Sequence, residues 1–412
     1  MHVTRVALFA SLVFAPQTVA AQSDQTTRAF TGLTVIDGTD RPPIRDAIIL
    51  VRNGRVVSVG PARSLTIPAG AERVALDGKI AIPGLINAHG HVNEPKDLRT
   101  FAAYGVTTVF SLGGEQPPVF AARADQNVPT LDRARVFVSG PVLTPTTPDE
   151  AKVQVAGVKA QNVDIVKIRV DDNLGTVQKM TPDVYRAVID EAHKHGLRVA
   201  SHLFYLADAK SLLAAGADFV AHSVRDTEVD AELISALKSR GVCVSPTLMR
   251  EVSTFVYEST PAFFSDPFFL AHANAEWVRT LQEPVRQQAV RNSTSAQRYK
   301  AALEVAKRNV KRLSAGGVTI AMGTDTGPTG RFQGFFELME LELMVESGLT
   351  PRQAIASATR DAARCMKADR DLGTLEPGKW ADFVVLDASP LDDIRNVRRI
   401  SSVYIAGNKV QR

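Results

Sequence analysis

Short apolar runs recur through the middle of the chain and alternate with stretches of helical character. Seven runs rich in Val, Ile, Phe and Ala occupy residues 107–110, 135–138, 165–168, 198–201, 219–221, 242–245 and 318–322. Residues 79–82 provide a further run ahead of them, as the first of eight. Near-continuous apolar strands joined by helices are typical of a parallel sheet covered on both faces. Eight such units predict an α/β fold, a closed (β/α)8 barrel.

A different pattern flanks this region on both sides. Strand-like runs at 33–36, 47–51, 55–59 and 73–76 are separated by turn signals such as Asp37-Gly38 and Asn53-Gly54, and strand patterns return at 383–386 and 402–405. Such spacing predicts a small β-domain. We therefore expect a β-sandwich built from both chain termini, with residues 22–82 and 371–412 flanking a barrel over 83–370.

One connection in the barrel pattern is longer than the others. About seventy residues separate the last two predicted strands. Within this connection we predict an insertion over about 247–300, which is rich in aromatic residues: Phe255, Tyr257, Phe263, Phe264, Phe268, Phe269 and Trp277. Barrels vary their substrate pockets through loops at the carboxyl ends of the strands. The insertion is therefore either a lid or a segment whose rings pack it onto the barrel.

The beginning of the chain has the features of a targeting segment. Arg5 precedes an apolar run over 6–15, and small residues over 19–21 precede Gln22. This pattern predicts a signal peptide over 1–21 and an exported protein, periplasmic or secreted; a buried N-terminal helix is the alternative. The chain has two cysteines, Cys243 and Cys365, 122 positions apart, and we expect both to be buried thiols.

Composition excludes several classes of protein. The chain has 412 residues, of which 45% are hydrophobic and 22% charged, typical of a globular protein. The net charge is 48 − 44 = +4, and the basic residues are scattered. Nucleic acid is therefore not an expected partner. After residue 21 there is no second apolar run of about 18 residues, so we expect no membrane span.

Four histidines fall at or just beyond the ends of predicted strands: His89, His91, His202 and His222. Residues i and i+2 of an extended segment point to the same side, so His89 and His91 can direct both rings toward one point. Imidazole is a common ligand of zinc and related cations. Asp325, at the end of the eighth predicted strand, could both bind metal and accept a proton.

Lys167 lies inside the fourth predicted strand, where a cationic side chain is costly. A bare ammonium there would repel metal cations. An amine that has been carbamylated by carbon dioxide would instead be an anionic ligand that could bridge two cations.

Three segments carry a resemblance to a known family. They are PGLINAHGH at 83–91, TDTG at 324–327 and GTLEPGKWADFVVLD at 373–387. The first resembles the metal-binding opening motif of the amidohydrolase superfamily, and the last resembles its return to the small β-sandwich. With the Lys167 segment, the sequence is most similar to the binuclear zinc-dependent prolidase and imidazolonepropionase-like branch.

The resemblance implies a site with two divalent metal ions, zinc being favoured. Its ligands would be His89, His91 and Asp325 for the more buried ion and His202 and His222 for the more exposed one. N6-carboxylated Lys167 would bridge the two ions. Members with true imidazolonepropionase activity use one metal and lack this lysine, so Lys167 argues against that activity.

The expected reaction is hydrolysis of a carbon–nitrogen bond by metal-activated hydroxide, with Asp325 passing the proton from water to the leaving amine. We expect a small dipeptide or N-acyl amino acid as substrate. Arg225 and Arg250 are candidates to bind its carboxylate, and Tyr205 could add a hydroxyl. Relatives often have a tyrosine where Arg225-Asp226 stands, which argues against proline dipeptides.

Other functions remain open. A deaminase, or a hydrolase of cyclic amides or lactones, would use the same metal chemistry, and a non-catalytic metal-binding module would use the same barrel. Apart from a small-molecule substrate, the sequence leaves a homo-oligomer open as a partner.

Overall fold

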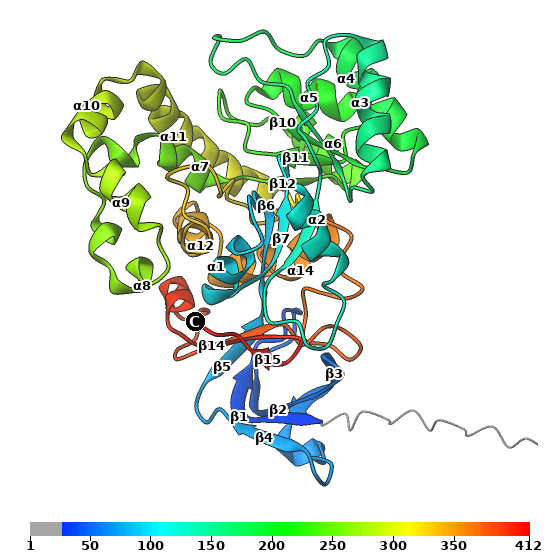
Figure 1. The fold of residues 1–412 in the computed structure, drawn as a ribbon, viewed down its shortest axis with the longest axis vertical. Coiled ribbons are helices and arrows are strands. Elements are labelled where there is room, and N and C mark those ends of the chain that lie inside the picture. The colour runs from blue at the N-terminus through cyan, green and yellow to red at the C-terminus, as the bar shows by residue number, and fades with distance from the viewer. Residues whose placement is uncertain (1–26) are drawn as a thin grey trace, which may run out of the picture.

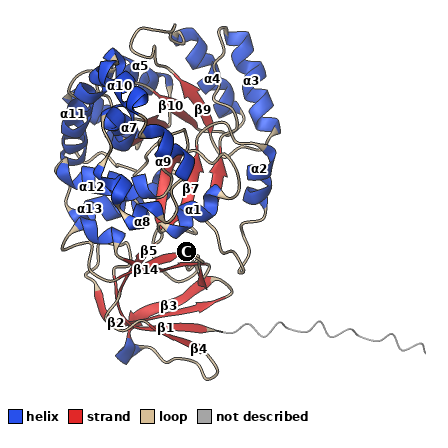
Figure 2. Ribbon diagram, turned by 60° about the vertical axis from the view of Figure 1, so that its left-hand side comes forward, coloured by secondary structure: helices blue, strands red, loops and turns tan. Residues whose placement is uncertain are grey.

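The computed structural model describes residues 27–412, so the predicted signal peptide lies outside the described residues. The molecule is a mixed α/β protein with a helix-rich part above a smaller β-rich part (Figures 1 and 2). In the described residues, no helix is both long and apolar enough to cross a membrane.

The β-rich part is one eight-stranded sheet from both ends of the chain. Its strand order is β15-β14-β13-β5-β1-β2-β3, with β4 beside β1. The strands are β1 (Arg28–Val35), β2 (Ile44–Arg52), β3 (Arg55–Pro61), β4 (Glu72–Ala75), β5 (Ile80–Pro83), β13 (Phe383–Leu386), β14 (Ile400–Ile405) and β15 (Asn408–Lys409). Figure 1 shows the blue and the orange-to-red strands side by side. Phe30, Phe383 and Tyr404 pack their rings together in its core.

The prediction that residues 79–82 form the first barrel strand is wrong. They lie in β5, which pairs antiparallel with β13 and parallel with β1 in the small sheet. The first strand of the helix-rich part is β6 (Leu85–Gly90), which follows directly after Gly84. Both segments are apolar. Residues 79–82 join the small sheet because β5 pairs with β13, in which Phe383 lies opposite Pro83.

The helix-rich part contains two parallel sheets. One has the order β6-β7-β8 and the other β12-β11-β10-β9. The strands after β6 are β7 (Val106–Ser111), β8 (Arg135–Val138), β9 (Val166–Arg169), β10 (Val199–His202), β11 (Phe219–Ala221) and β12 (Cys243–Ser245). The helices between them are α1 (Asp97–Ala103), α2 (Pro117–Ala124), α3 (Pro148–Ala160), α4 (Pro182–Lys194), α5 (Leu206–Ala215) and α6 (Ala231–Arg240).

Backbone hydrogen bonds join the two parallel sheets at both of their edges. Between β8 and β9, Asp164 N donates to Val138 O at 2.8 Å and Leu143 N donates to Lys167 O at 2.8 Å. Beyond β12, the predicted eighth strand at 318–322 is reduced to one bridge, between Val244 and Ile320. Its Met322 O accepts from Ala88 N of β6 at 2.8 Å.

The insertion after β12 is helical. It comprises α7 (Leu248–Phe255), α8 (Pro267–Leu270), α9 (Ala275–Leu281), α10 (Pro284–Asn292) and α11 (Thr294–Ala315), with 3-10 turns at Val256–Glu258 and Ala262–Ser265. Phe263, Phe264 and Phe269 pack against Phe332 and against α12 (Phe335–Glu346). Of the two predicted roles, these rings take the packing role. The chain continues through α13 (Pro351–Ser357) and α14 (Arg360–Cys365); 3-10 turns at Ala62–Ser64 and Ile394–Arg398 complete the helical elements.

The prediction of two buried thiols is wrong, because Cys243 and Cys365 form a disulfide. Cys243 begins β12 and Cys365 ends α14, and their Cα atoms lie 5.8 Å apart. Arg198 holds the end of α14 in place by donating to the carbonyl oxygens of Cys365 and Met366. The fold brings these distant positions together beneath the amino ends of the strands.

Candidate metal centre

The six predicted ligand positions lie on five segments that end at the same side of the parallel sheets. His89 is in β6 and His91 follows it, Lys167 is in β9, and His202 ends β10. His222 directly follows β11, and Asp325 follows the 318–322 segment. Carboxyl ends of parallel strands share one edge, and this edge is where catalytic groups gather in such folds.

His89, His91 and Asp325 form one half of the site. Asp325 Oδ1 lies 2.8 Å from His91 Nε2 and 3.3 Å from His89 Nε2. His91 Nδ1 faces the Gly113 carbonyl oxygen at 3.0 Å, which orients the other nitrogen toward the site. Gly327 permits this approach, since a Cβ there would lie 2.6 Å from the His91 carbonyl oxygen.

His202 and His222 form the other half. His222 Nε2 lies 2.8 Å from His202 Nδ1, and the outer nitrogens of the two rings are held by Thr247 Oγ1 at 2.7 Å and by Asp171 Oδ2 at 2.8 Å. Burial lowers the pKa of His202 to about 3 and lowers that of His222 well below its ordinary range. Both rings are therefore neutral, which is the form that binds metal.

Lys167 connects the two halves. Its Nζ lies 2.9 Å from His89 Nε2, and the side chain is buried. Burial lowers the pKa of the Lys167 amine to about 7. A substantial fraction of the amine is then unprotonated at neutral pH, and only the unprotonated amine can react with carbon dioxide.

The donor set fits a divalent cation. His89, His222 and Asp325 each offer a ligand atom, and these atoms lie within 4.8 Å of one another. Burial raises the pKa of the Asp325 carboxyl, but Arg331 and His91 outweigh this and hold the pKa well below its usual range. Nitrogen ligands from neutral imidazoles with an ionised carboxylate are those that zinc-type sites use. The site can therefore hold a metal ion.

Backbone strain accompanies these positions. His222 and Asp325 have φ values of 74° and 61°, a region that costs a residue with a side chain on the order of 1–3 kcal/mol. Strain of this kind concentrates at functional sites, where surrounding contacts hold it in place. Here Asp325 N donates to the His89 carbonyl oxygen at 2.7 Å, and His222 N donates to the Ser245 carbonyl oxygen at 2.9 Å.

Several residues that support the site were missed by sequence reasoning. Arg331 forms an ion pair with Asp325, and Asp171 holds His202. Buried Glu337 of α12 accepts from Asn87, Thr324 and Thr326, and so fixes the loop around Asp325. The spacing of Asp171, four residues after Lys167 on the same strand end, is a signal that could have indicated it.

Asp171→Asn should lower kcat/KM by about 10- to 100-fold, and metal affinity by a similar factor, because the His202 ring loses a charged partner. Steady-state kinetics and metal titration measure the two effects. Asp190→Asn, an exposed change on α4, should alter neither. Unchanged metal affinity in the Asp171 variant would contradict this role.

Each of the three predicted substrate-binding residues contacts an acidic side chain of the protein, and both arginines are buried. Arg225 is buried, with Nε 2.9 Å from Glu251 Oε1, and Arg250 Nη1 lies 3.1 Å from both oxygens of the same carboxylate. The Tyr205 hydroxyl donates to Asp172 Oδ1 at 2.9 Å. Their substrate roles stay predictions.

Comparisons with known proteins agree with this architecture. An imidazolonepropionase of Streptomyces coelicolor is 26% identical over 365 residues, covering 84% of this chain and 86% of that protein. An ochratoxinase of Aspergillus niger is 27% identical over 227 residues, covering 55% of this chain but only 39% of its own length.

Solved structures share the fold. A protein named as a prolidase from Bifidobacterium longum superposes with a TM-score of 0.78 at 27% identity, covering 94% of this chain and 95% of that one. A Xaa-Pro dipeptidase with bound methionine superposes with a TM-score of 0.74 at 19% identity, covering 94% and 100%, which shows the fold alone.

The family model of the amidohydrolase family matches residues 80–410, most of the chain. That match includes both halves of the site and the strands that return to the small sheet. The chain belongs to the amidohydrolase family, and it is a metal-binding hydrolase of carbon–nitrogen bonds.

Proposed function

We propose that this protein cleaves the amide bond of a small N-acyl amino acid or dipeptide at a site with two divalent cations, zinc being favoured. The observation that carries the proposal is the convergence of four imidazoles, one carboxylate and one buried lysine at one strand edge. His89, His91 and Asp325 would hold one cation and His202 and His222 the other. Bound divalent cations supply Lewis acidity that activates water and polarises a carbonyl.

The scaffold we propose for this site is a closed (β/α)8 barrel with a β-sandwich beside it. The hydrogen bonds from Leu143 to Lys167, from Ala321 to Val244 and from Ala88 to Met322 support closure, because they join the edges of both parallel sheets. The 318–322 segment would be the eighth strand.

Asp325 is the proposed proton carrier. Its carboxylate is ionised, so it can accept a proton from the attacking water and pass it to the leaving nitrogen. Arg331 holds one oxygen of this carboxylate and His91 contacts the other, which keeps the carboxylate in position throughout.

Cleavage of cyclic amides is the second candidate, because the similarity to the imidazolonepropionase extends over 84% of the chain. Lys167 argues against that activity itself. Deamination is the remaining alternative among hydrolases of carbon–nitrogen bonds, and the substrate panel also includes lactones as a test of bond type.

A substrate panel separates these functions. The purified protein, loaded with Zn²⁺, is assayed against N-acyl amino acids, dipeptides, cyclic amides and lactones, and released amine, ammonia and acid are measured separately. We expect amine release, two equivalents of bound metal, loss of turnover after chelation and recovery with Zn²⁺. Ammonia release or acid without amine would favour the alternatives, and full turnover after exhaustive chelation would contradict a metal-dependent reaction.

N6-carboxylation of Lys167 is a proposal of its own. The neutral amine would attack carbon dioxide, forming the carbamate and releasing one proton, and the carbamate would bridge the two cations. After incubation with ¹³C-bicarbonate we expect a carbamate carbon signal that is absent from Lys167→Met. This variant should also lose at least one metal equivalent and about 10²-fold in kcat/KM, since the bridging anion is gone. Full metal content in the variant would contradict the bridge.

We also propose export to the periplasm or beyond, with removal of residues 1–21. The Cys243–Cys365 disulfide supports this, because disulfides persist in oxidising compartments. N-terminal sequencing of protein from the exported fraction should begin at Gln22, and a start at Met1 would contradict cleavage. A homo-oligomeric assembly stays a prediction.

A further inference from the structure

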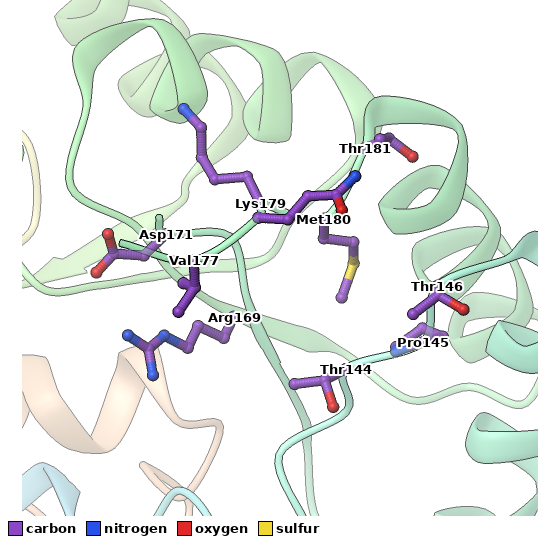
Figure 3. A pocket seen from close by; sticks show the side chains of 10 residues that line it. Thr144, Pro145, Thr146, Arg169, Asp171, Val177, Lys179, Met180 and Thr181 are labelled. Atoms are coloured by element: carbon purple, nitrogen blue, oxygen red, sulfur yellow. The ribbon is translucent and has the colours of Figure 1, made fainter. Parts of the chain in front are cut away.

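A cavity of about 290 Å³ lies beside the candidate metal centre, at the carboxyl end of β9. Its walls come from residues 144–146 and 177–181, and Arg169 and Asp171 contribute from the strand end, as Figure 3 shows. Asp171 also contacts His202 of the metal centre. The cavity and the proposed reaction site therefore share one side chain.

Arg169 and Lys167 point to the same side of β9, because alternate residues of a strand do so. Lys167 is the buried member of the pair and contacts His89, whereas Arg169 is half-buried and lies nearer the strand end. Figure 3 shows its side chain extending through the cavity, with the guanidinium on the side of Val177 and Asp171.

The guanidinium of Arg169 has no partner within residues 27–412. No side-chain hydrogen bond or ion pair of this range involves Arg169, and its Nε is shielded from solvent without an acceptor. Other cations of the region are paired: Lys179 binds Asp208, and Arg225 and Arg250 share Glu251. A buried donor without an acceptor costs about 1–3 kcal/mol, which an anionic ligand would recover.

The neighbouring Asp171 does not serve as that acceptor. One of its oxygens contacts His202 Nε2 at 2.8 Å and the other accepts from Asn173 N at 2.9 Å. The free face of the guanidinium is thus open to an outside group. Val177 and Met180, on the same cavity wall, add apolar surface beside it.

We propose that Arg169 binds the carboxylate of the substrate and makes this enzyme select anionic acyl amino acids; the inference rests on the proposed function. A guanidinium binds a carboxylate through two parallel hydrogen bonds, and the adjacent apolar wall would receive the substrate's side chain. The site shares Asp171 with the metal centre, so a small amino-acid substrate bound by Arg169 would lie next to a metal ligand. Arg225 and Arg250 would each have to give up its contact with Glu251 to bind a carboxylate in the same way.

Matched substrates test the proposal. N-acetyl-L-leucine and its neutral carboxamide differ only in the group that Arg169 would bind, and kcat/KM is measured for both with wild type, Arg169→Met and Arg169→Lys. We expect Arg169→Met to lose about 30-fold on the carboxylate substrate and less than about threefold on the carboxamide. Arg169→Lys should retain part of the preference, because it keeps the charge but not the fork. Arg186→Met, an exposed change on α4, is the control and should match wild type.

A loss by Arg169→Met that is equal on both substrates, or no loss on either, would overturn the proposal. If wild type cleaves neither compound, the proposed substrate class fails, and calorimetric binding of N-acetyl-L-leucine decides the role of Arg169. Binding at least tenfold weaker in Arg169→Met than in wild type would support carboxylate recognition. Equal binding, or no binding by wild type, would overturn it. If Arg169→Met fails to fold, the same comparison is made with Arg169→Lys.

Discussion

We expect Asp325→Asn to lower kcat by about 10³-fold or more, while the fold and the thermal stability stay close to those of wild type. The amide can neither accept the proton of the attacking water nor deliver it to the leaving nitrogen. Asn is the suitable replacement because Asp325 has a φ of 61°, and Asn tolerates this region better than most other residues. Steady-state kinetics and circular dichroism measure the two quantities.

Metal content must be measured on the same Asp325→Asn samples. An amide oxygen can still serve as a ligand, so loss of turnover with metal retained would place the effect on proton transfer. Asp149→Asn, an exposed change on α3, is the control and should leave kcat unaltered. If the Asp325 variant kept more than a tenth of wild-type turnover, the proton would have another carrier, and the role given to Asp325 would be wrong.

The candidate metal ligands could be predicted from the sequence, whereas the residues that hold these ligands in position could not. His89 and His91 were found because alternation along a strand is a local property. Arg331 was missed because its contact with Asp325 depends on the loop between two distant elements. Glu337 was missed for a similar reason, since its three donors come from β6 and from the loop around Asp325.

The strand pattern was informative in the middle of the fold and misleading at its edges. Residues 135–138 and 219–221 form strands with the predicted bounds, because each is a short, mostly apolar run between helices. At the amino end, two apolar runs are separated only by Pro83 and Gly84, and no periodicity distinguishes them. At the other end, residues 318–322 form a single β-bridge, between Ile320 and Val244, and no regular strand.

The disulfide is a further contact between distant segments that the sequence pattern could not predict. A separation of 122 positions says nothing of proximity, and the pairing follows from the register of β12 and the end point of α14. Both side chains are nearly inaccessible, so burial was predicted correctly and bonding was not.

Removing that disulfide should have the largest effect on stability. Cross-linking closes a loop of 122 residues in the unfolded chain, which by chain entropy corresponds to about 4–5 kcal/mol. We expect the double variant C243A/C365A to lose about this much free energy of unfolding in urea denaturation. The bond lies at the amino end of β12, whereas the metal centre lies at the carboxyl ends, so kcat/KM at 25 °C should stay within about threefold of wild type.

Reductant provides the matched control, because it opens the bond without deleting any atom from the core. Wild type in dithiothreitol should shift its unfolding midpoint toward that of C243A/C365A, and the double variant should not respond. The remaining difference between them measures the small cavity that alanine leaves. If dithiothreitol left the wild-type midpoint unchanged while mass spectrometry showed both thiols reduced, the prediction that the cross-link stabilises the fold by restricting the unfolded chain would be wrong. A shift in wild type alone would instead confirm that the cross-link stabilises the fold, and unchanged kcat/KM in the same reduced sample would separate this effect from the chemistry at the opposite end of the strands.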